Sequence, residues 1–209
     1  MLKLSAFGAS YDVEAPVAGA FQAENILCAL GLAVGTGVPV DRAIAAIGRL
    51  ASVPGRLELA AVLANRAAVY VDYAHTPDAL DNVLRSVRPH VGANGKLHVL
   101  FGCGGDRDPG KRAMMGAIAA RGADLVIVTD DNPRSENPAV IRAAILAAAP
   151  GAREIGERGE AISAAVRLLE SGDALLIAGK GHETGQIIGD STFAFSDREA
   201  AQAALETWR

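Results

Sequence analysis

The stretch Asp124-Leu-Val-Ile-Val-Thr-Asp-Asp-Asn-Pro-Arg134 changes from apolar to polar within a few residues. Its first half is a short β-branched run typical of a buried strand, and its second half is typical of a loop. Similar apolar runs occupy 68–72, 96–101 and 174–178, with a weaker one near 153–155, and helical patterns separate them. This alternation predicts an α/β fold: a Rossmann-like, mostly parallel sheet with helices on both faces.

Three of the helices are predicted to begin in the same way, with a capping side chain followed by proline. These starts are Thr76-Pro77, Asp108-Pro109 and Asn137-Pro138, and each lies just beyond a predicted strand. In open α/β sheets the ligand crevice lies outside the carboxyl ends of the strands. We therefore expect four polar segments to converge on one cleft: 72–78, 102–112, 130–134 and 179–183.

Residues 1–54 have a different pattern. A short polar segment precedes two helical patterns, from about Gly19 to Val34 and from Val40 to Arg49. Their apolar side chains need partners that this segment does not supply, so we interpret it as the C-terminal remnant of a larger domain. The predicted boundary lies near 52–55, and residues 55–209 form the second domain.

Composition excludes several classes of protein. The formal net charge of −4 argues against binding to a nucleic-acid backbone, so no nucleic-acid partner is expected. Apolar runs are too short to cross a membrane, and no signal peptide is evident, so we expect a cytoplasmic protein. The cysteines, Cys28 and Cys103, have no metal-ligand or disulfide spacing and are predicted to be reduced thiols.

Two polar segments together predict a pocket for a zwitterionic amino acid. Asn132 and Arg134 offer planar donors suited to a carboxylate, and Glu183, in Gly179-Lys-Gly-His-Glu183, can accept from an ammonium group. The alternative for Arg134 is a surface ion pair, and the residues alone leave these two interpretations about even. For Glu183 the residues alone favour an exposed side chain on a glycine-rich turn.

Several motifs occur in an order that adds a family resemblance. They are Gly55-Arg-Leu-Glu58, Val71-Asp-Tyr-Ala-His-Thr-Pro-Asp-Ala79, Phe101-Gly-Cys-Gly-Gly-Asp-Arg-Asp108, Asp131-Asn-Pro-Arg134 and Gly179-Lys-Gly-His-Glu183. The series resembles the C-terminal part of the Mur ligases that add meso-diaminopimelate to UDP-N-acetylmuramoyl-L-alanyl-D-glutamate. Phe21-Gln-Ala-Glu-Asn25 resembles the end of the family's central ATPase domain.

The resemblance implies a set of substrate-binding residues: Arg107, Asp131, Asn132, Pro133, Arg134, Gly179 and Glu183. Arg134, helped by Asn132 and Arg107, would grip the distal carboxylate of diaminopimelate, and Gly179 and Glu183 would hold its other end. Lysine lacks that distal carboxylate and would leave the donors unpaired, which can discriminate by roughly 10⁴. In family members that add lysine, the arginine of this motif is replaced.

The resemblance also implies nucleotide contacts: Asn25 to adenine, Asp72 to ribose hydroxyls, and Arg56 toward ribose or phosphate. The family often has Asn where this chain has Gln22. Without the resemblance, the alternative for Asp72 is a helix-start or loop carboxylate, and the alternative for Arg56 is a linker ion pair. ATP and Mg²⁺ are the cofactors expected in the complete enzyme, with no metal ligand in this chain.

Three further features carry predictions of their own. Gly105-Asp-Arg-Asp-Pro-Gly-Lys111 has the spacing of a phosphate loop, but Arg112 replaces the required Ser or Thr and Pro109 removes an amide. We interpret it as a glycine turn that presents Arg107, although a phosphate-loop kinase or ATPase is a weaker alternative. His182 is predicted to order its loop, and Lys180 is predicted to be a solvated surface charge.

Taken together, the resemblance implies the C-terminal portion of an ATP-dependent amide ligase of peptidoglycan precursor synthesis. The phosphate loop, the magnesium site and the site for UDP-MurNAc-dipeptide are expected in missing N-terminal and central domains. We therefore predict no catalytic residue here and no turnover by this chain alone. The alternative function is a non-catalytic module that binds diaminopimelate.

Overall fold

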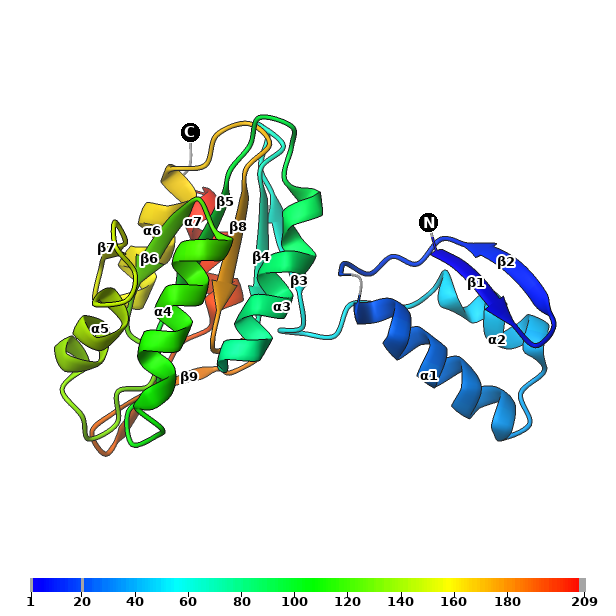
Figure 1. Ribbon diagram of the computed structural model, residues 1–209, viewed down its shortest axis with the longest axis horizontal. Helices are drawn as coiled ribbons and strands as arrows, with labels where there is room; N and C mark the ends of the chain where they lie inside the picture. The colour runs from blue at the N-terminus through cyan, green and yellow to red at the C-terminus, as the bar shows by residue number, and fades with distance from the viewer. Residues whose placement is uncertain (1, 20, 207–209) are drawn as a thin grey trace. The chain divides into compact units, whose positions relative to one another are not determined.

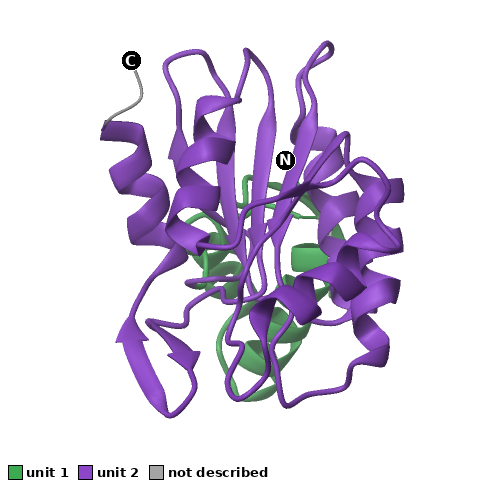
Figure 2. Cartoon of the chain, turned by 90° about the vertical axis from the view of Figure 1, so that its left-hand side faces the viewer, with its two compact units in different colours: residues 1–53 green, residues 54–209 purple. Residues whose placement is uncertain are grey.

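The computed structural model describes residues 2–19 and 21–206 and divides the chain into two compact units, residues 1–53 and 54–209 (Figure 2). The division falls one residue from the predicted boundary. The identities of the two parts, a remnant of an ATPase domain and an amino-acid-binding domain, stay predictions. In the described part of the chain, no helix combines the length and apolar character needed to cross a membrane.

Unit 1 is a β-hairpin with two helices. Its elements are β1 (Leu2–Ala6), β2 (Ala9–Val13), α1 (Phe21–Gly35) and α2 (Val40–Ile47). The antiparallel hairpin was not predicted, although its turn has a recognisable cause: Phe7 and Gly8 both have positive φ, 54° and 78°, as tight hairpin turns require. Leu4, Ile26 and Ile47 form a small buried cluster, while Leu32 on α1 remains 72% exposed.

Unit 2 is built on a mixed sheet in which the strand order is β3-β4-β8-β5-β6-β7. The strands are β3 (Glu58–Val62), β4 (Ala68–Asp72), β5 (Leu97–Phe101), β6 (Leu125–Val128), β7 (Arg153–Glu154) and β8 (Ala174–Ala178). Neighbours from β4 to β7 pair in parallel, and β3 pairs with β4 antiparallel. The predicted fold class is confirmed, but β3 was missed, because its sequence Glu-Leu-Ala-Ala-Val has few β-branched residues.

Helices cover both faces of this sheet, as Figure 1 shows. They are α3 (Pro77–Val87), α4 (Gly110–Gly122), α5 (Pro138–Leu146), α6 (Arg158–Arg167) and α7 (Asp197–Glu206), with a short 3₁₀ turn η1 (Arg88–His90) after α3. α3, α4 and α5 lie side by side on one face, and α6 packs with α7 on the other. A second hairpin, β9 (Gly185–Ile188) with β10 (Ser191–Ala194), was not predicted.

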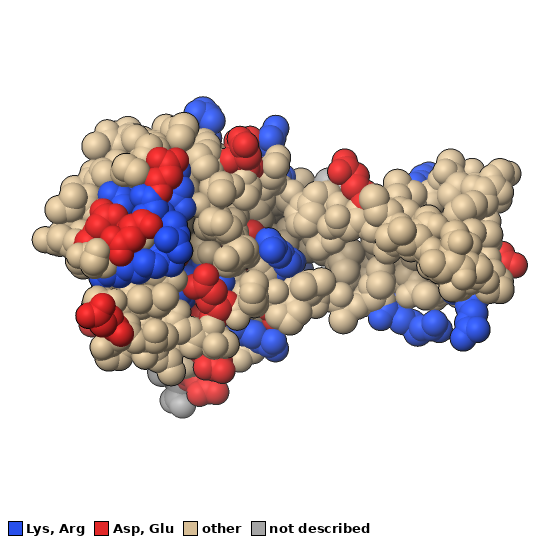
Figure 3. Space-filling view, turned by 90° about the horizontal axis from the view of Figure 1, so that it is seen from below, with Lys and Arg blue, Asp and Glu red and all other residues tan. Residues whose placement is uncertain are grey.

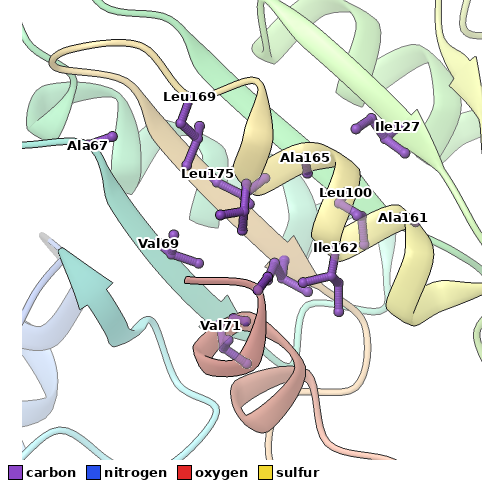
Figure 4. Close-up of a cluster of buried hydrophobic side chains, with 14 of the residues drawn as sticks. Ala67, Val69, Val71, Leu100, Ile127, Ala161, Ile162, Ala165, Leu169 and Leu175 are labelled. Atoms are coloured by element: carbon purple, nitrogen blue, oxygen red, sulfur yellow. The ribbon is translucent and has the colours of Figure 1, made fainter. Parts of the chain in front are cut away.

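The core under α6 shows why this helix sits close to the sheet. Its small residues Ala161 and Ala165 and the larger Ile162 face strand residues such as Leu175, and all are fully buried (Figure 4). Fully burying a large aliphatic side chain contributes about 1.5–3 kcal/mol. The continuous apolar runs of the strands are therefore matched by helices on both sides, as a parallel sheet needs.

Two of the three predicted helix starts are confirmed. The side chain of Thr76 accepts from the Ala79 N–H at 3.4 Å, and that of Asn137 accepts from the Ala139 N–H at 3.0 Å. The third start differs, because α4 begins at Gly110 and Pro109 precedes it. Asp108 Oδ1 accepts from the Gly110 N–H at 2.8 Å, so its carboxylate caps the loop just before the helix.

The order of the strands creates a switch point in the sheet. β8 comes after β7 in the sequence, but it pairs between β4 and β5, with its crossover helix α6 on the face opposite α3. Where successive crossovers leave a sheet on opposite faces, a crevice opens beyond the carboxyl ends of the strands. The carboxyl ends of β4, β5, β6 and β8 therefore define where the site should lie.

Candidate functional site

A hollow of about 420 Å³ lies at the carboxyl ends of the parallel strands of unit 2. Its lining comes from four segments: 73–77 after β4, 102–111 after β5, 131–134 after β6 and 179–183 after β8. The predicted convergence of these segments on one cleft is thus confirmed. Figure 3 is viewed from this end of the sheet and shows lysine and arginine atoms gathered around acidic ones.

Most of the predicted substrate-binding residues line this hollow. They are Arg107, Asp131, Asn132, Arg134, Gly179 and Glu183. Pro133 is not part of the lining, and its carbonyl accepts from the Glu136 N–H at 3.1 Å within the loop after β6. The hollow brings these side chains together, while their roles toward a ligand stay predictions.

Arg134 is held by its own backbone and by the neighbouring glycine loop. Its φ of 51° is left-handed, and its N–H donates to the Ile187 carbonyl at 3.1 Å, which ties the loop to β9. Nη1 donates to the Gly105 carbonyl at 2.8 Å. A Cβ on Gly104 would lie 2.8 Å from Nη1, so this loop must pass close to the guanidinium. Nε and Nη2 have no hydrogen-bond partner among the described residues and remain available to an anion.

Glu183 is a partly exposed carboxylate at the end of the segment 179–183, which follows β8. Its Oε2 accepts from Asn132 Nδ2 at 3.0 Å and from Lys180 Nζ at 2.9 Å. Burial would raise the pKa of Glu183, but these hydrogen bonds and the charges of Lys180 and Arg134 outweigh burial and lower it. Glu183 is therefore anionic at neutral pH and suited to an ammonium group.

The prediction that Lys180 is a solvated surface charge is wrong, because its side chain is fully buried. The backbone explains the error. Gly179 and Gly181 have positive φ, 115° and 55°, which turn the chain so that Lys180 points inward. A Cβ at Gly179 would lie 2.8 Å from Asp131 Oδ2, so this tight turn also requires the close approach that glycine permits.

The loop after β5 is clasped to the loop after β6 at the mouth of the hollow. Asp106 accepts from the N–H and the hydroxyl of Ser135, at 3.2 Å and 2.6 Å, and these bonds lower its pKa. Arg112, nearly buried, donates through Nη2 to both oxygens of Glu136 at 2.8 Å. Arg107 is exposed between these contacts, and its Nη1 donates to the Asp106 carbonyl at 2.9 Å.

The same contacts exclude a phosphate loop at 105–111. The Gly105 N–H donates to the Asn132 carbonyl, the Asp106 N–H to Glu136, and the Gly110 N–H to Asp108. Amides that are already engaged cannot cradle a phosphate. The segment is a glycine turn with Arg107 on the lining of the hollow, as predicted.

The residues that were predicted to contact a nucleotide, Asn25, Arg56 and Asp72, are not part of the lining of the hollow. Asp72 is nearly buried and accepts from the N–H groups of Leu57 and Ala74, both at 2.7 Å. Burial raises the pKa of Asp72, although both hydrogen bonds and Arg56 oppose the rise. The Arg56 guanidinium lies 5.0 Å from the centre of the Tyr73 ring. Asn25 belongs to α1 of unit 1, where its Nδ2 donates to Gln22 at 3.0 Å.

His182 and Tyr73 pack beside this motif. The ring of His182 is tilted against Tyr73 with centroids 5.1 Å apart, and the ring of His75 meets Tyr73 edge-on at 4.6 Å. This contact joins the ring of exposed His182 to the segment after β4, and its role in ordering the loop stays a prediction. Within residues 2–19 and 21–206, no group of His, Cys, Asp and Glu is arranged to hold a metal ion.

One buried arginine that supports the loops of the hollow was not predicted from the sequence. Arg158 is fully buried, and its guanidinium pairs with Asp197 at 2.7 Å and 2.8 Å. The same guanidinium donates to the carbonyls of Asp130 and Ala178, which follow β6 and end β8. It therefore braces two of the loops that line the hollow. No local pattern in the sequence distinguishes Arg158 from a surface arginine.

Comparison with known proteins identifies a family that this chain matches. The family described as "Mur ligase, glutamate ligase domain" matches residues 55–181. The UDP-N-acetylmuramoyl-L-alanyl-D-glutamate--2,6-diaminopimelate ligase of Mesorhizobium japonicum is 59% identical over 97% of this chain and 42% of its own length. The ligase of the same name from a Chelativorans species is 58% identical over 95% of this chain and 41% of its own.

A solved structure of a ligase with the same printed name has a TM-score of 0.71 to this chain at 37% identity. The match covers 98% of this chain and 42% of that protein. The chain thus spans about two fifths of the length of the relatives that it matches.

Proposed function

This chain belongs to the Mur ligase family, and from that membership we propose that it supplies the amino-acid pocket of an ATP-dependent ligase. The ligase adds meso-diaminopimelate to UDP-N-acetylmuramoyl-L-alanyl-D-glutamate during peptidoglycan precursor synthesis. One observation carries the proposal: Arg134 and Glu183, of opposite charge, line one hollow.

The lining of that hollow offers both kinds of charge that diaminopimelate needs. Arg134 keeps Nε and Nη2 for the distal carboxylate, and Arg107 at the mouth adds a second guanidinium. Glu183, which stays ionised, receives the amino group beside the other carboxylate. Charge-assisted bonds of this kind are shorter and stronger than neutral ones.

In the complete ligase, ATP activates the peptide's carboxylate as an acyl phosphate. The amine of diaminopimelate then attacks the acyl carbon, phosphate leaves and the nitrogen loses a proton. The residues of this chain bind and orient the amine, which lowers the entropy cost of bringing two substrates together. We propose that ATP and Mg²⁺ are held mainly by parts of the ligase outside these 209 residues. Asn25, Arg56 and Asp72 are proposed to touch the nucleoside, and the protein is proposed to act in the cytoplasm.

A titration followed by NMR tests the pocket. We expect meso-diaminopimelate to shift the backbone signals of 102–111, 131–134 and 179–183, and L-lysine at the same concentration to leave them in place. Arg134→Ala should abolish the shifts, whereas Arg167→Ala, on the exposed side of α6, should keep them. Equal binding of lysine, or full binding by Arg134→Ala, would contradict the proposed pocket.

An activity assay separates the ligase from a non-catalytic binding module. The chain alone, given ATP, UDP-MurNAc-dipeptide and meso-diaminopimelate, is expected to form no tripeptide, because its relatives are more than twice as long. The same chain joined to the N-terminal part of a relative is expected to form it. A binding module would yield no product in either form.

A further inference from the structure

Lys180 is a buried charge that the proposed pocket does not yet explain. It follows β8, its side chain has no exposed surface, and it is absent from the lining of the hollow. A buried ammonium group is costly unless it is paired and hydrogen-bonded. Its partners therefore indicate what this lysine contributes.

The Lys180 ammonium group donates to three acceptors from different parts of the site. Nζ donates to Asn132 Oδ1 at 3.0 Å, to Glu183 Oε2 at 2.9 Å and to the Gly185 carbonyl at 2.6 Å. An ammonium group has three N–H donors, so all of them are used. Lys180 keeps no donor for a ligand, which separates its role from those of Arg134 and Arg107.

The contact with Asn132 decides how that side-chain amide is oriented. Oδ1 of Asn132 accepts from Lys180 and also from the Ile187 N–H at 3.0 Å. Its Nδ2 therefore faces Glu183, and a flipped amide would set N–H groups against two donors. One N–H of Nδ2 donates to Glu183, and the second remains for a carboxylate in the hollow.

The contact with Glu183 holds that carboxylate by one oxygen. Oε2 accepts from Lys180 and Asn132, while Oε1 has no hydrogen-bond partner among the described residues. The hydrogen bond from Lys180 is the largest influence that opposes burial and keeps the pKa of Glu183 low. Oε1 is thereby left charged and open to an ammonium group.

We propose that Lys180 is a positioning residue of the amino-acid pocket, holding Asn132 and Glu183 as one donor and acceptor unit toward the hollow without contacting the amino acid. The inference rests on the proposed function for the identity of the ligand. The geometry of the three hydrogen bonds does not depend on that identity.

The charged neighbours of Glu183 must be known before its titration is interpreted. Lys180 lies beside it, Arg134 acts from the loop after β6, and Arg158 from α6 lies near enough to interact with it. The other charged or titratable side chains on the lining of the hollow are Tyr73, His75, Arg107, Asp108, Lys111 and Asp131. Because these groups remain in a Lys180 variant, a change in the Glu183 titration reports the loss of Lys180 itself.

The first test measures the pKa of Glu183 from its side-chain carboxyl ¹³C signal, without ligand. Lys180→Met removes the ammonium group at similar length, and Lys96→Met makes the same change at an exposed lysine before β5. In Lys180→Met the pKa of Glu183 should rise, because the hydrogen bond and the charge of Lys180 no longer oppose the effect of burial. It should stay low in Lys96→Met. An unchanged pKa in Lys180→Met would overturn the proposal.

The second test compares affinities for meso-diaminopimelate. Lys180→Met should weaken binding about tenfold or more, and adding it to Glu183→Gln should weaken binding little further, since coupled residues are not additive. Fully additive losses would mean that Lys180 does not act through Glu183. If the wild-type chain binds no meso-diaminopimelate, the proposed function fails, while the pKa test still decides the role of Lys180.

A third measurement needs no variant and so remains decisive if Lys180→Met does not fold. In the wild-type protein, the side-chain ¹⁵N signals of Lys180 and Asn132 are followed during the titration. Meso-diaminopimelate should move the Asn132 amide signal and leave the Lys180 ammonium signal nearly unmoved. The reverse pattern would place Lys180 in direct contact with the ligand and overturn the proposal.

Discussion

The two ends of the unit 2 sheet each carry a buried charged cluster, but the charges face different surroundings. At the amino end, Asp173 accepts from His98 Nε2 at 3.1 Å and from the N–H groups of Lys96 and Glu170. At the carboxyl end, Lys180 and Asn132 hold Glu183, whose second oxygen has no partner in the described structure.

The comparison of Asp173 with Glu183 shows that a hydrogen-bonded carboxylate can serve either stability or ligand binding, depending on its surroundings. Asp173 is nearly buried, and its bonds tie the start of β5 to the start of β8, away from the lining of the hollow. Glu183 keeps a third of its side chain exposed and stands on the lining of the hollow. We infer that substitutions in the cluster at the amino end should change stability alone. Substitutions in the loop that follows β8 should also change ligand binding.

The largest effect on stability is expected from Arg158→Met. This variant tests whether the loops at the carboxyl end depend on the buried ion pair of Arg158 with Asp197. Removing the guanidinium leaves Asp197 buried without its partner, so the free energy of unfolding of unit 2 should fall by about 3–5 kcal/mol. Urea unfolding measures the loss. Arg167→Met, at an exposed site on the same helix, should change stability by less than about 0.5 kcal/mol. A small loss in Arg158→Met would show that the brace is dispensable.

Next in size is Asp173→Asn at the amino end. The new amide keeps one acceptor oxygen but loses the charge and sets an NH₂ group against backbone donors, so unfolding free energy should fall by about 1–3 kcal/mol. Chemical denaturation measures the change. Affinity for meso-diaminopimelate, measured in parallel, should be unaltered. A weakened affinity would break the division between the two ends.

At the amino end of the sheet, His98 beside Asp173 should make the stability of unit 2 depend on pH. Burial lowers the pKa of His98 below its ordinary 6.5, despite the opposing effect of Asp173, and its buried Nδ1 has no hydrogen-bond partner in the described structure. The unfolded chain then binds more protons between the two pKa values. The free energy of unfolding is therefore unaffected by His98 above about pH 6.5. It falls as the pH drops from there toward the lower pKa of His98 in the folded protein, by at most about 1.4 kcal/mol per pH unit.

Urea unfolding between pH 7 and pH 5 checks this expectation. In His98→Gln the slope over that range should disappear, whereas His75→Gln, at an exposed histidine of the carboxyl end, should retain it. An equal slope in both variants would assign the pH dependence to other groups.

The smallest effect on stability is expected for Arg134→Ala. Its guanidinium donates mainly to the Gly105 carbonyl at the edge of the hollow, so the free energy of unfolding should change by about 1 kcal/mol or less. Thermal and urea unfolding measure it, and affinity for meso-diaminopimelate should nonetheless be lost. A large destabilisation would indicate that Arg134 serves the fold and that its loss of binding is indirect.

Part of this site was accessible from local sequence. Strands β4 and β8 have the predicted bounds, since continuous apolar runs between glycine and polar segments identify buried parallel strands. Thr76 and Asn137 were correctly predicted as caps, because proline at the first helical position follows each. The edge strand β3 and the β9–β10 hairpin lacked such signals, and β9 is nevertheless the strand that anchors Asn132 through the Ile187 N–H.

By itself the sequence determined the parallel sheet, the loops that gather at its carboxyl ends, and the motifs that resemble the Mur ligases. Only the tertiary structure decided that Lys180 is buried against Asn132 and that Arg158 is buried against Asp197. The physical reason is distance along the chain. Apolar runs and caps act between near neighbours, whereas these hydrogen bonds join side chains 48 and 39 residues apart and form only after the strands have packed.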